Sequence, residues 1–252
     1  MGKEHPDTAT TYSNIASVYD NKGEYNKALE YFMKALDVIE NVLGNENLAT
    51  ATIHNNIGIV FRKKGEYNKA LEYYEKALDI RKKVLGKEHS LTATTYNNIA
   101  LVYKNKGEYD KALEYYIKDL TISENVLEKE HPDTATTYNN IAAVYNNKGE
   151  YELALGYFAK ALDIREMVLG KEHPDTATTY NNIAAVYNNK GEYDKALEFY
   201  KKALPILINV LGLEHPNTKA TYNNMKITYE ESGKTEPFEE WLKKNLHLLF
   251  GE

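Results

Sequence analysis

The sequence predicts an all-α protein, a solenoid of stacked helical hairpins, and two kinds of repetition carry the prediction. The twenty-one residues at 131–151 return unchanged at 173–193, and glycines recur at a spacing of 42 residues. A fixed period of 20 to 50 residues is typical of solenoids, because each unit is too small to bury its own apolar face and must stack on its neighbours. The glycines are Gly23, Gly65, Gly107, Gly149, Gly191 and Gly233.

The segment before each glycine is predicted to form the first helix of a hairpin. Its apolar residues recur at i, i+3, i+4 and i+7, which places them on one stripe of a helix. The helix is expected to start at "HPDT", where Pro132 suits the first turn and Asp133 favours the positive end of the helix dipole. Asn47 occupies the histidine phase in repeat two, so this phase is predicted to be the N-cap. In repeat four the stripe is Tyr138, Ile141, Ala142 and Tyr145.

The segment after each glycine is predicted to form a longer second helix. The sequence "NKGEY" places glycine where a helix ends in a left-handed residue, which predicts a tight turn between two helices. Each repeat should therefore fold as an αα-hairpin. In repeat three the helical spacing runs through Tyr109, Ala112, Leu113, Tyr116 and Leu120, and it continues to Val126 and Leu127.

Departures from the repeat predict local irregularities. Asp119 replaces an alanine of the helix contact, so it should either be paired or loosen repeat three. Pro205 should kink or end the second helix of repeat five, and Gly156 should cost its helix about 1 kcal/mol. After Gly233 the pattern stops, and the last repeat is expected to be a divergent cap. The cap helix should bury a stripe of Phe238, Trp241, Leu242, Leu246 and Leu249, with Trp241 packed against repeat five or the first helix of repeat six.

Composition narrows the classes of function. The chain has no long apolar run and starts without an apolar stretch after a basic one, which predicts a cytoplasmic protein without a membrane span. The absence of cysteine excludes disulfides but fits either redox compartment. The net charge of −6 and the pI near 5.7 argue against a nucleic-acid surface, whose affinity comes largely from clustered lysine and arginine. We therefore expect protein or peptide partners, and a monomer or weak self-association.

The repeat resembles the tetratricopeptide repeat (TPR), and its 42-residue length resembles the repeats of kinesin light chains. The resemblance rests on the phases of Tyr180, Ile183, Ala184, Tyr187, Ala196, Tyr200 and Ala203. It implies a right-handed superhelix of six stacked hairpins in one domain, residues 1–252. The expected repeats are approximately 5–46, 47–88, 89–130, 131–172, 173–214 and 215–252.

An enzyme is not expected, and neither is a metal or cofactor. The histidines at the repeat phase are the obvious candidates, but equivalent side chains of neighbouring repeats lie roughly 10 Å apart. Metal ligands must converge to bonds of about 2 Å, so these histidines are interpreted as helix caps. His54 replaces a core tyrosine and is expected to be partly buried. No phosphate-binding loop or catalytic serine motif occurs in the sequence.

The resemblance also implies that the first helices line a concave groove, which is the candidate binding site. An asparagine ladder there could bond the main chain of an extended peptide, unless one asparagine of each pair bonds the neighbouring helix instead. Three cations make repeats two and three locally basic. The candidate groove residues are Asn55, Ile59, Arg62, Lys63, Asn97, Leu101, Lys104, Asn139 and Asn181.

Two functions follow as alternatives. The favoured one is a non-enzymatic scaffold that binds an extended acidic peptide with one large apolar residue over repeats two to four. Such motifs are what kinesin light chain repeats take, so this detail is implied by the resemblance. The alternative is a structural spacer or self-association module of a larger signalling protein, which the near-identical central repeats would suit.

Overall fold

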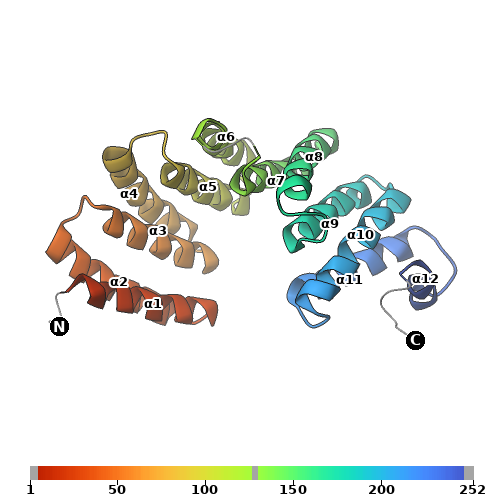
Figure 1. Cartoon of the computed structure of the whole chain (residues 1–252), viewed down its shortest axis with the longest axis horizontal. Helices are drawn as coiled ribbons and strands as arrows, with labels where there is room; N and C mark the ends of the chain where they lie inside the picture. Colours follow the sequence, from red (N-terminus) through yellow and green to blue (C-terminus); the bar gives the residue numbers. More distant parts are fainter. Residues whose placement is uncertain (1–4, 127–129, 247–252) are drawn as a thin grey trace. The chain divides into compact units, whose positions relative to one another are not determined.

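The structure is a computed structural model that describes residues 5–126 and 130–246. In these residues the chain forms twelve helices and no strand, as the sequence predicts (Figure 1). The helices are α1 (Pro6–Asn21), α2 (Tyr25–Leu43), α3 (Leu48–Lys63), α4 (Tyr67–Leu85), α5 (Ser90–Asn105), α6 (Tyr109–Val126), α7 (Pro132–Asn147), α8 (Tyr151–Val168), α9 (Pro174–Asn189), α10 (Tyr193–Leu211), α11 (Pro216–Glu231) and α12 (Phe238–Asn245).

The chain divides into two compact units, Met1–Leu127 and Glu128–Glu252, with three hairpins in each. Within a hairpin the two helices pack along each other (Figure 1). Within a unit the second helix of one hairpin packs on the first helix of the next, as α2 does on α3 and α8 does on α9. The single domain expected from the repeats stays a prediction.

Each first helix starts at the predicted cap. The His5 Nδ1 atom accepts a hydrogen bond of 3.2 Å from the Asp7 amide, and the histidines of four later repeats do the same. In repeat two, Asn47 Oδ1 accepts bonds of 2.9 and 3.0 Å from two amides of the first turn. These bonds satisfy amide groups that a helix leaves open at its start. The cap assignment of the histidine phase is confirmed.

Glycine ends both helices of the hairpin for a conformational reason. Gly65, between α3 and α4, has φ +78°, and Gly86, after α4, has φ +93°. Residues with a side chain rarely adopt this left-handed region, so only glycine reverses the chain here at low cost. A glycine with positive φ follows the second helix in repeats one, four and five as well, as Gly44, Gly170 and Gly212. Its position explains why the second helix ends where it does.

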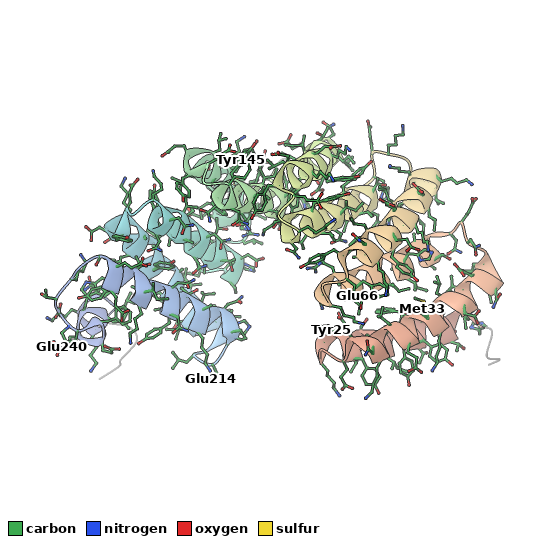
Figure 2. The ribbon with its side chains drawn as sticks, turned by 180° about the vertical axis from the view of Figure 1, so that it is seen from behind. Tyr25, Met33, Glu66, Tyr145, Glu214 and Glu240 are labelled. Carbon is green, nitrogen blue, oxygen red and sulfur yellow. The ribbon has the colours of Figure 1, made fainter. Side chains whose placement is uncertain are left out.

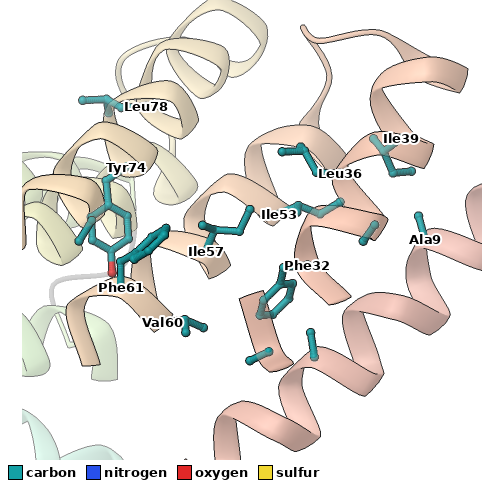
Figure 3. Packing of buried hydrophobic residues seen from close by; sticks show 14 of the residues in the cluster. Ala9, Phe32, Leu36, Ile39, Ile53, Ile57, Val60, Phe61, Tyr74 and Leu78 are labelled. Atoms are coloured by element: carbon teal, nitrogen blue, oxygen red, sulfur yellow. The ribbon is translucent and has the colours of Figure 1, made fainter. Parts of the chain in front are cut away.

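The core of unit 1 forms between the predicted stripes. Phe32, Ile53 and Ile57 meet where the first hairpin packs on the second (Figure 3). Tyr74 of α4 and Tyr116 of α6 are fully buried. Burying one such side chain contributes about 1.5–3 kcal/mol, so the hairpins are held together mainly by these contacts.

Pro205 does not end its helix early, because α10 continues from Tyr193 to Leu211. Of the two expected outcomes, the early end is therefore wrong, and the kink stays a prediction. Proline removes one backbone donor and crowds the preceding turn, but its neighbours Leu204, Ile206 and Leu207 are buried. Tertiary packing of this face holds the helix together across the proline.

Asp119 is buried and paired, which decides between the two outcomes expected for it. Its Oδ2 atom accepts a hydrogen bond of 2.7 Å from Asn97 Nδ2, and its Oδ1 atom accepts one of 3.2 Å from Ser123 Oγ. Hydrogen bonds offset part of the cost of removing a carboxylate from water. The helix α6 accordingly runs without interruption to Val126.

The cap helix α12 forms as predicted but is short. Phe238, Leu242 and Leu246 are buried against repeat five and α11. Trp241 is only partly buried, with its ring 4.8 Å from that of Tyr229. Leu249, the last residue of the expected stripe, lies outside the described residues.

Candidate functional site

The candidate site of unit 1 lies on α3 and α5, the first helices of the second and third hairpins. We call Ile59, Arg62, Lys63, Leu101 and Lys104 the A-helix surface. Lys63 is exposed and the other four are partly exposed. The helices that carry them end at turns with dense charge, such as the one at Glu66 (Figure 2), which pairs with Lys64 at 2.8 Å and Lys69 at 2.7 Å.

Asparagines of successive repeats bond to one another. Asn55 is only 7% exposed, and its Oδ1 atom accepts a hydrogen bond of 2.9 Å from Asn98 Nδ2. Unit 2 repeats the arrangement, with Asn182 Nδ2 donating to Asn139 Oδ1 at 3.1 Å. The acceptor groups of Asn55 and Asn139 thus serve repeat stacking. This is the arrangement that the sequence analysis weighed against a peptide-binding ladder.

The other two candidate asparagines also bond within the protein. Asn97 donates to Asp119, as described above, and Asn181 Oδ1 accepts a bond of 3.0 Å from Thr221 Oγ1. Both are partly exposed. In both asparagines, part of the side-chain amide is therefore used by a bond within the protein, which sequence spacing did not predict. Their role toward a ligand stays a prediction.

Lys63 is neutralised by the preceding repeat. Its Nζ atom lies 2.7 Å from Asp20 Oδ2 at the end of α1. Unit 2 has an uncharged counterpart, in which Asn189 Nδ2 donates to Asn146 Oδ1 at 3.0 Å. Because Asp20 neutralises the charge of Lys63, the positive potential of the A-helix surface comes mainly from Arg62 and Lys104.

Arg62 lies over two buried phenols. Its positive charge acts on the hydroxyls of Tyr74 and Tyr116, although burial dominates and raises the pKa of Tyr74 to about 12. The Arg62 Nε atom and both hydroxyls are buried without a hydrogen bond of good geometry. Buried polar atoms without partners are uncommon in folded proteins.

Sequence reasoning treated these tyrosines only as core. At this phase repeats one and four have Phe32 and Phe158, whereas repeats two, three and five have tyrosines. Repeats two and three carry a cation at the phase of Arg62, but repeat five carries Asn188. The combination of hydroxyl and cation is therefore confined to repeats two and three, and the tyrosine alone does not predict it.

Lys104 is the second unneutralised cation. It is partly buried, and desolvation lowers its pKa because burial disfavours the charged form. Among the residues that the structure describes, neither Arg62 nor Lys104 forms an ion pair with a carboxylate. Beside them Ile59 and Leu101 remain partly exposed. The A-helix surface therefore combines positive charge with apolar area.

The opposite side of the hairpins is self-paired. Lys76 lies 2.7 Å from Glu72, and Lys34 and Lys118 make the same i,i+4 pair in their own repeats. Exposed pairs of this kind contribute little to stability, and they leave no net charge for a ligand. The i,i+4 spacing of Glu72 and Lys76 in the sequence predicts such a solvated pair, and the geometry confirms it.

Within residues 5–126 and 130–246, no group of three or more acidic or histidine side chains is arranged to hold a metal ion. Among the helices of the same residues, none is both long and apolar enough to cross a membrane.

Hairpins with capped first helices, glycine turns and aromatic cores define a helical repeat protein. The sequence profile of the tetratricopeptide repeat matches residues 7–83, 50–118, 91–167, 133–208 and 175–244. These overlapping matches cover most of the chain, so the chain belongs to the tetratricopeptide repeat family. Repeats of this fold generally serve as non-enzymatic scaffolds for protein–protein interaction.

Solved structures show the same fold at low sequence identity. A Podosopora anserina protein with kinesin light chain-type, nearly identical TPR-like repeats has a TM-score of 0.67 at 21% identity, over 81% of this chain and 97% of that one. BtubC (BKLC) from P. vanneervenii has 0.67 at 23%, over 96% and 88%. The apo form of RapI has 0.73 at 21%, over 95% and 81%. No curated protein matches the chain.

Proposed function

We propose that this protein is a scaffold that binds an extended acidic peptide on the A-helix surface of unit 1. The observation that carries the proposal is the pair of cations without a carboxylate partner, Arg62 and Lys104, beside the partly exposed Ile59 and Leu101. An acidic side chain of the ligand would neutralise the cations, and one large apolar side chain would cover Ile59 and Leu101.

Charge supports an acidic rather than a basic ligand. Opposite charges about 4 Å apart attract by about 1 kcal/mol in bulk water and by more where water is partly excluded. Lys104 is already partly desolvated, so part of the cost of bringing it out of water has been met in folding. The chain as a whole carries a net charge of −6 and therefore repels acidic ligands in general. A local positive surface would attract an acidic peptide to that surface alone.

The asparagine ladder contributes less to this proposal than the cations do. Asn55 is buried and bonded to Asn98, which removes its carbonyl oxygen from the surface. Main-chain recognition would fall instead to groups such as Asn97, whose side chain is partly exposed. Sequence selectivity in the ligand should therefore follow charge and one apolar contact.

The alternative function is a spacer or self-association module. The near-identity of residues 131–151 and 173–193 favours it, because a spacer needs no variation along its surface. In unit 1, by contrast, one position near the end of each first helix changes from Asp20 to Arg62 to Lys104 from repeat to repeat, while the core positions hardly change. A binding surface has a reason to vary in this way, and a spacer has none.

The test is a binding titration with a fluorescein-labelled peptide of about twelve residues, rich in aspartate and glutamate and containing one tryptophan. Arg62→Glu combined with Lys104→Glu should weaken binding at least tenfold, about 1.4 kcal/mol. Added salt should weaken it too, because screening acts on such contacts.

The matched control is charge reversal on the opposite face. Lys76→Glu changes the net charge in the same direction at an exposed i,i+4 pair and should leave affinity within about twofold. Thermal unfolding of each variant establishes that it is folded, and Lys104→Gln repeats the test with a milder change. Equal losses per charge from the two faces would mean that long-range charge is being measured, and the proposed site would be rejected.

A further inference from the structure

The outer side of α1 exposes Val18, whose equivalent is buried in every first helix with a preceding hairpin in its unit. Val18 is 53% exposed. The same phase holds Val60, Val102 and Val186, each fully buried beneath the second helix of the preceding hairpin. Burying a valine side chain stabilises a folded protein, whereas leaving it in water does not. A valine at position 18 is therefore typical of a surface that another element covers.

Polar bonds between hairpins define what covers the equivalent face of α9. Four side chains of α9 and its turn bond to side chains of the hairpin α7–α8, and each bond joins one repeat to the next. The bonds are Arg165 to Thr179 at 2.8 Å, Asn182 to Asn139 at 3.1 Å, Asn189 to Asn146 at 3.0 Å and Lys190 to Glu152 at 2.7 Å.

Unit 1 uses the same kinds of bond. Asn98 bonds to Asn55, and Arg81 donates to Thr95 at 2.7 Å. Lys64 donates to Asn26 at 2.8 Å, at the phase of Lys190 and Glu152. Three of the four kinds of bond at α9 thus recur in unit 1, two of them at α5 and one at α3.

The outer side of α1 has residues of the same types that make all four of these bonds in α9. At the four phases that bond in α9, α1 and its turn have the same four residue types, and all four are exposed. They are Thr11, Asn14, Asn21 and Lys22. Together with Val18 they form one continuous surface, which we call the α1 outer face.

We propose that the α1 outer face is an open repeat interface whose occupant is a helical hairpin of this same 42-residue type, with the side chains that repeat four presents. The occupant must bring an amide acceptor for Asn14, a second one for Asn21 and a carboxylate for Lys22. It must also bring a guanidinium for Thr11 and an apolar helix for Val18. Residues 131–172 supply all of these on one hairpin.

A second copy of this chain does not offer such a hairpin. In unit 2 the last hairpin is covered by the short helix α12, whose Phe238 and Leu242 are buried on α11. Two α1 outer faces placed against each other would bring no guanidinium for Thr11, because α1 contains no arginine. The match is therefore to a hairpin and not to another α1.

The experiment replaces residues 1–4 by a copy of residues 131–172, which keeps the 42-residue register. Hydrogen exchange of the α1 amides is measured in the original and extended chains, and far-UV circular dichroism reports whether the added hairpin is helical. Exchange in α1 should slow at least about tenfold, because terminal units of a solenoid open first and α1 would no longer be terminal.

Two variants show whether the gain comes from the proposed contacts. A copy with Asn139→Ala, Asn146→Ala and Glu152→Ala should slow α1 exchange clearly less than the intact copy. Val18→Lys should change α1 exchange by less than about threefold in the original chain, where a lysine near the helix end is exposed. In the extended chain, Val18→Lys should abolish the slowing of α1 exchange, since the lysine charge would be buried between two hairpins.

Several results would overturn the proposal. One is a helical added hairpin that leaves α1 exchange unchanged, and another is an added hairpin that stays unfolded. Equal effects of Val18→Lys in the two chains would have the same meaning. Light scattering of the original chain provides the last test. If the chain had twice the monomer mass, and Val18→Lys returned it to the monomer mass, the occupant would be a second copy and the proposal would be wrong.

Discussion

Acid should destabilise this protein through one residue, His54, which stands where the other repeats have tyrosine. The imidazole is 7% exposed, and its Nδ1 atom is buried without a partner. Burial lowers its pKa from 6.5 to about 4, and the charge of Lys76 acts in the same direction. Glu40 Oε1 lies 3.9 Å from Nε2, too far for a hydrogen bond that would favour the charged ring.

The direction and size of the effect follow from these pKa values. In the unfolded chain the imidazole takes up a proton as the pH falls through 6.5, while the folded protein stays neutral there until about pH 4. Stability is therefore fully present above pH 6.5 and falls below it. From pH 7.5 to 5.0 the loss from this residue is about 2 kcal/mol.

The assay compares the natural chain with His54→Tyr, the residue of the other repeats. Urea unfolding of both proteins at pH 7.5 and 5.0 removes the acid effects that they share. At pH 7.5 the variant should be at least as stable, because a tyrosine there can bond Glu40 as Tyr180 bonds Glu166. At pH 5.0 the difference between the two proteins should grow by about 2 kcal/mol.

An NMR titration of the His54 ring tests the same reasoning directly. A ring that titrates near 6.5 in the folded protein would refute the burial argument. A difference between the two proteins that is the same at both pH values would refute it as well. Either result would mean that Glu40 and water compensate the imidazolium in the folded state.

Three further predictions concern unit 2. Gly156→Ala should raise stability by about 1 kcal/mol in thermal unfolding, because the added Cβ meets nothing within 4 Å; no gain would contradict this. Pro205→Ala should raise it by about 2 kcal/mol by restoring a backbone donor within α10, and a loss would show that the proline is structurally required. Trp241 fluorescence should change no later in urea than far-UV helicity does, because α12 is terminal and short; a later change would exclude a fraying cap.

Local features of the candidate site could be predicted from residue spacing. Helical periodicity separates the phase of Arg62 and Lys104 from the core stripe, and both residues are partly exposed in the structure. The burial of Asn55 could not be predicted in this way, since its partner Asn98 lies 43 residues away. The neutralisation of Lys63 by Asp20 escaped prediction for the same reason.

The sequence by itself determined the hairpins, their turns and their caps, because these depend on neighbours within a few residues. Gly65 needs a left-handed backbone, and His5 caps an amide two residues away. Pro205 shows the limit, because local rules end its helix and the buried face of α10 maintains it.

Only the tertiary structure decided which side chains remain available. Contacts between repeats use polar groups about 42 residues apart, and the repeat pattern does not say which of two adjacent asparagines is used. It also decided that Val18 is exposed while identical valines are covered. The physical reason is that burial depends on what packs against a residue, and in a solenoid that neighbour comes from another repeat.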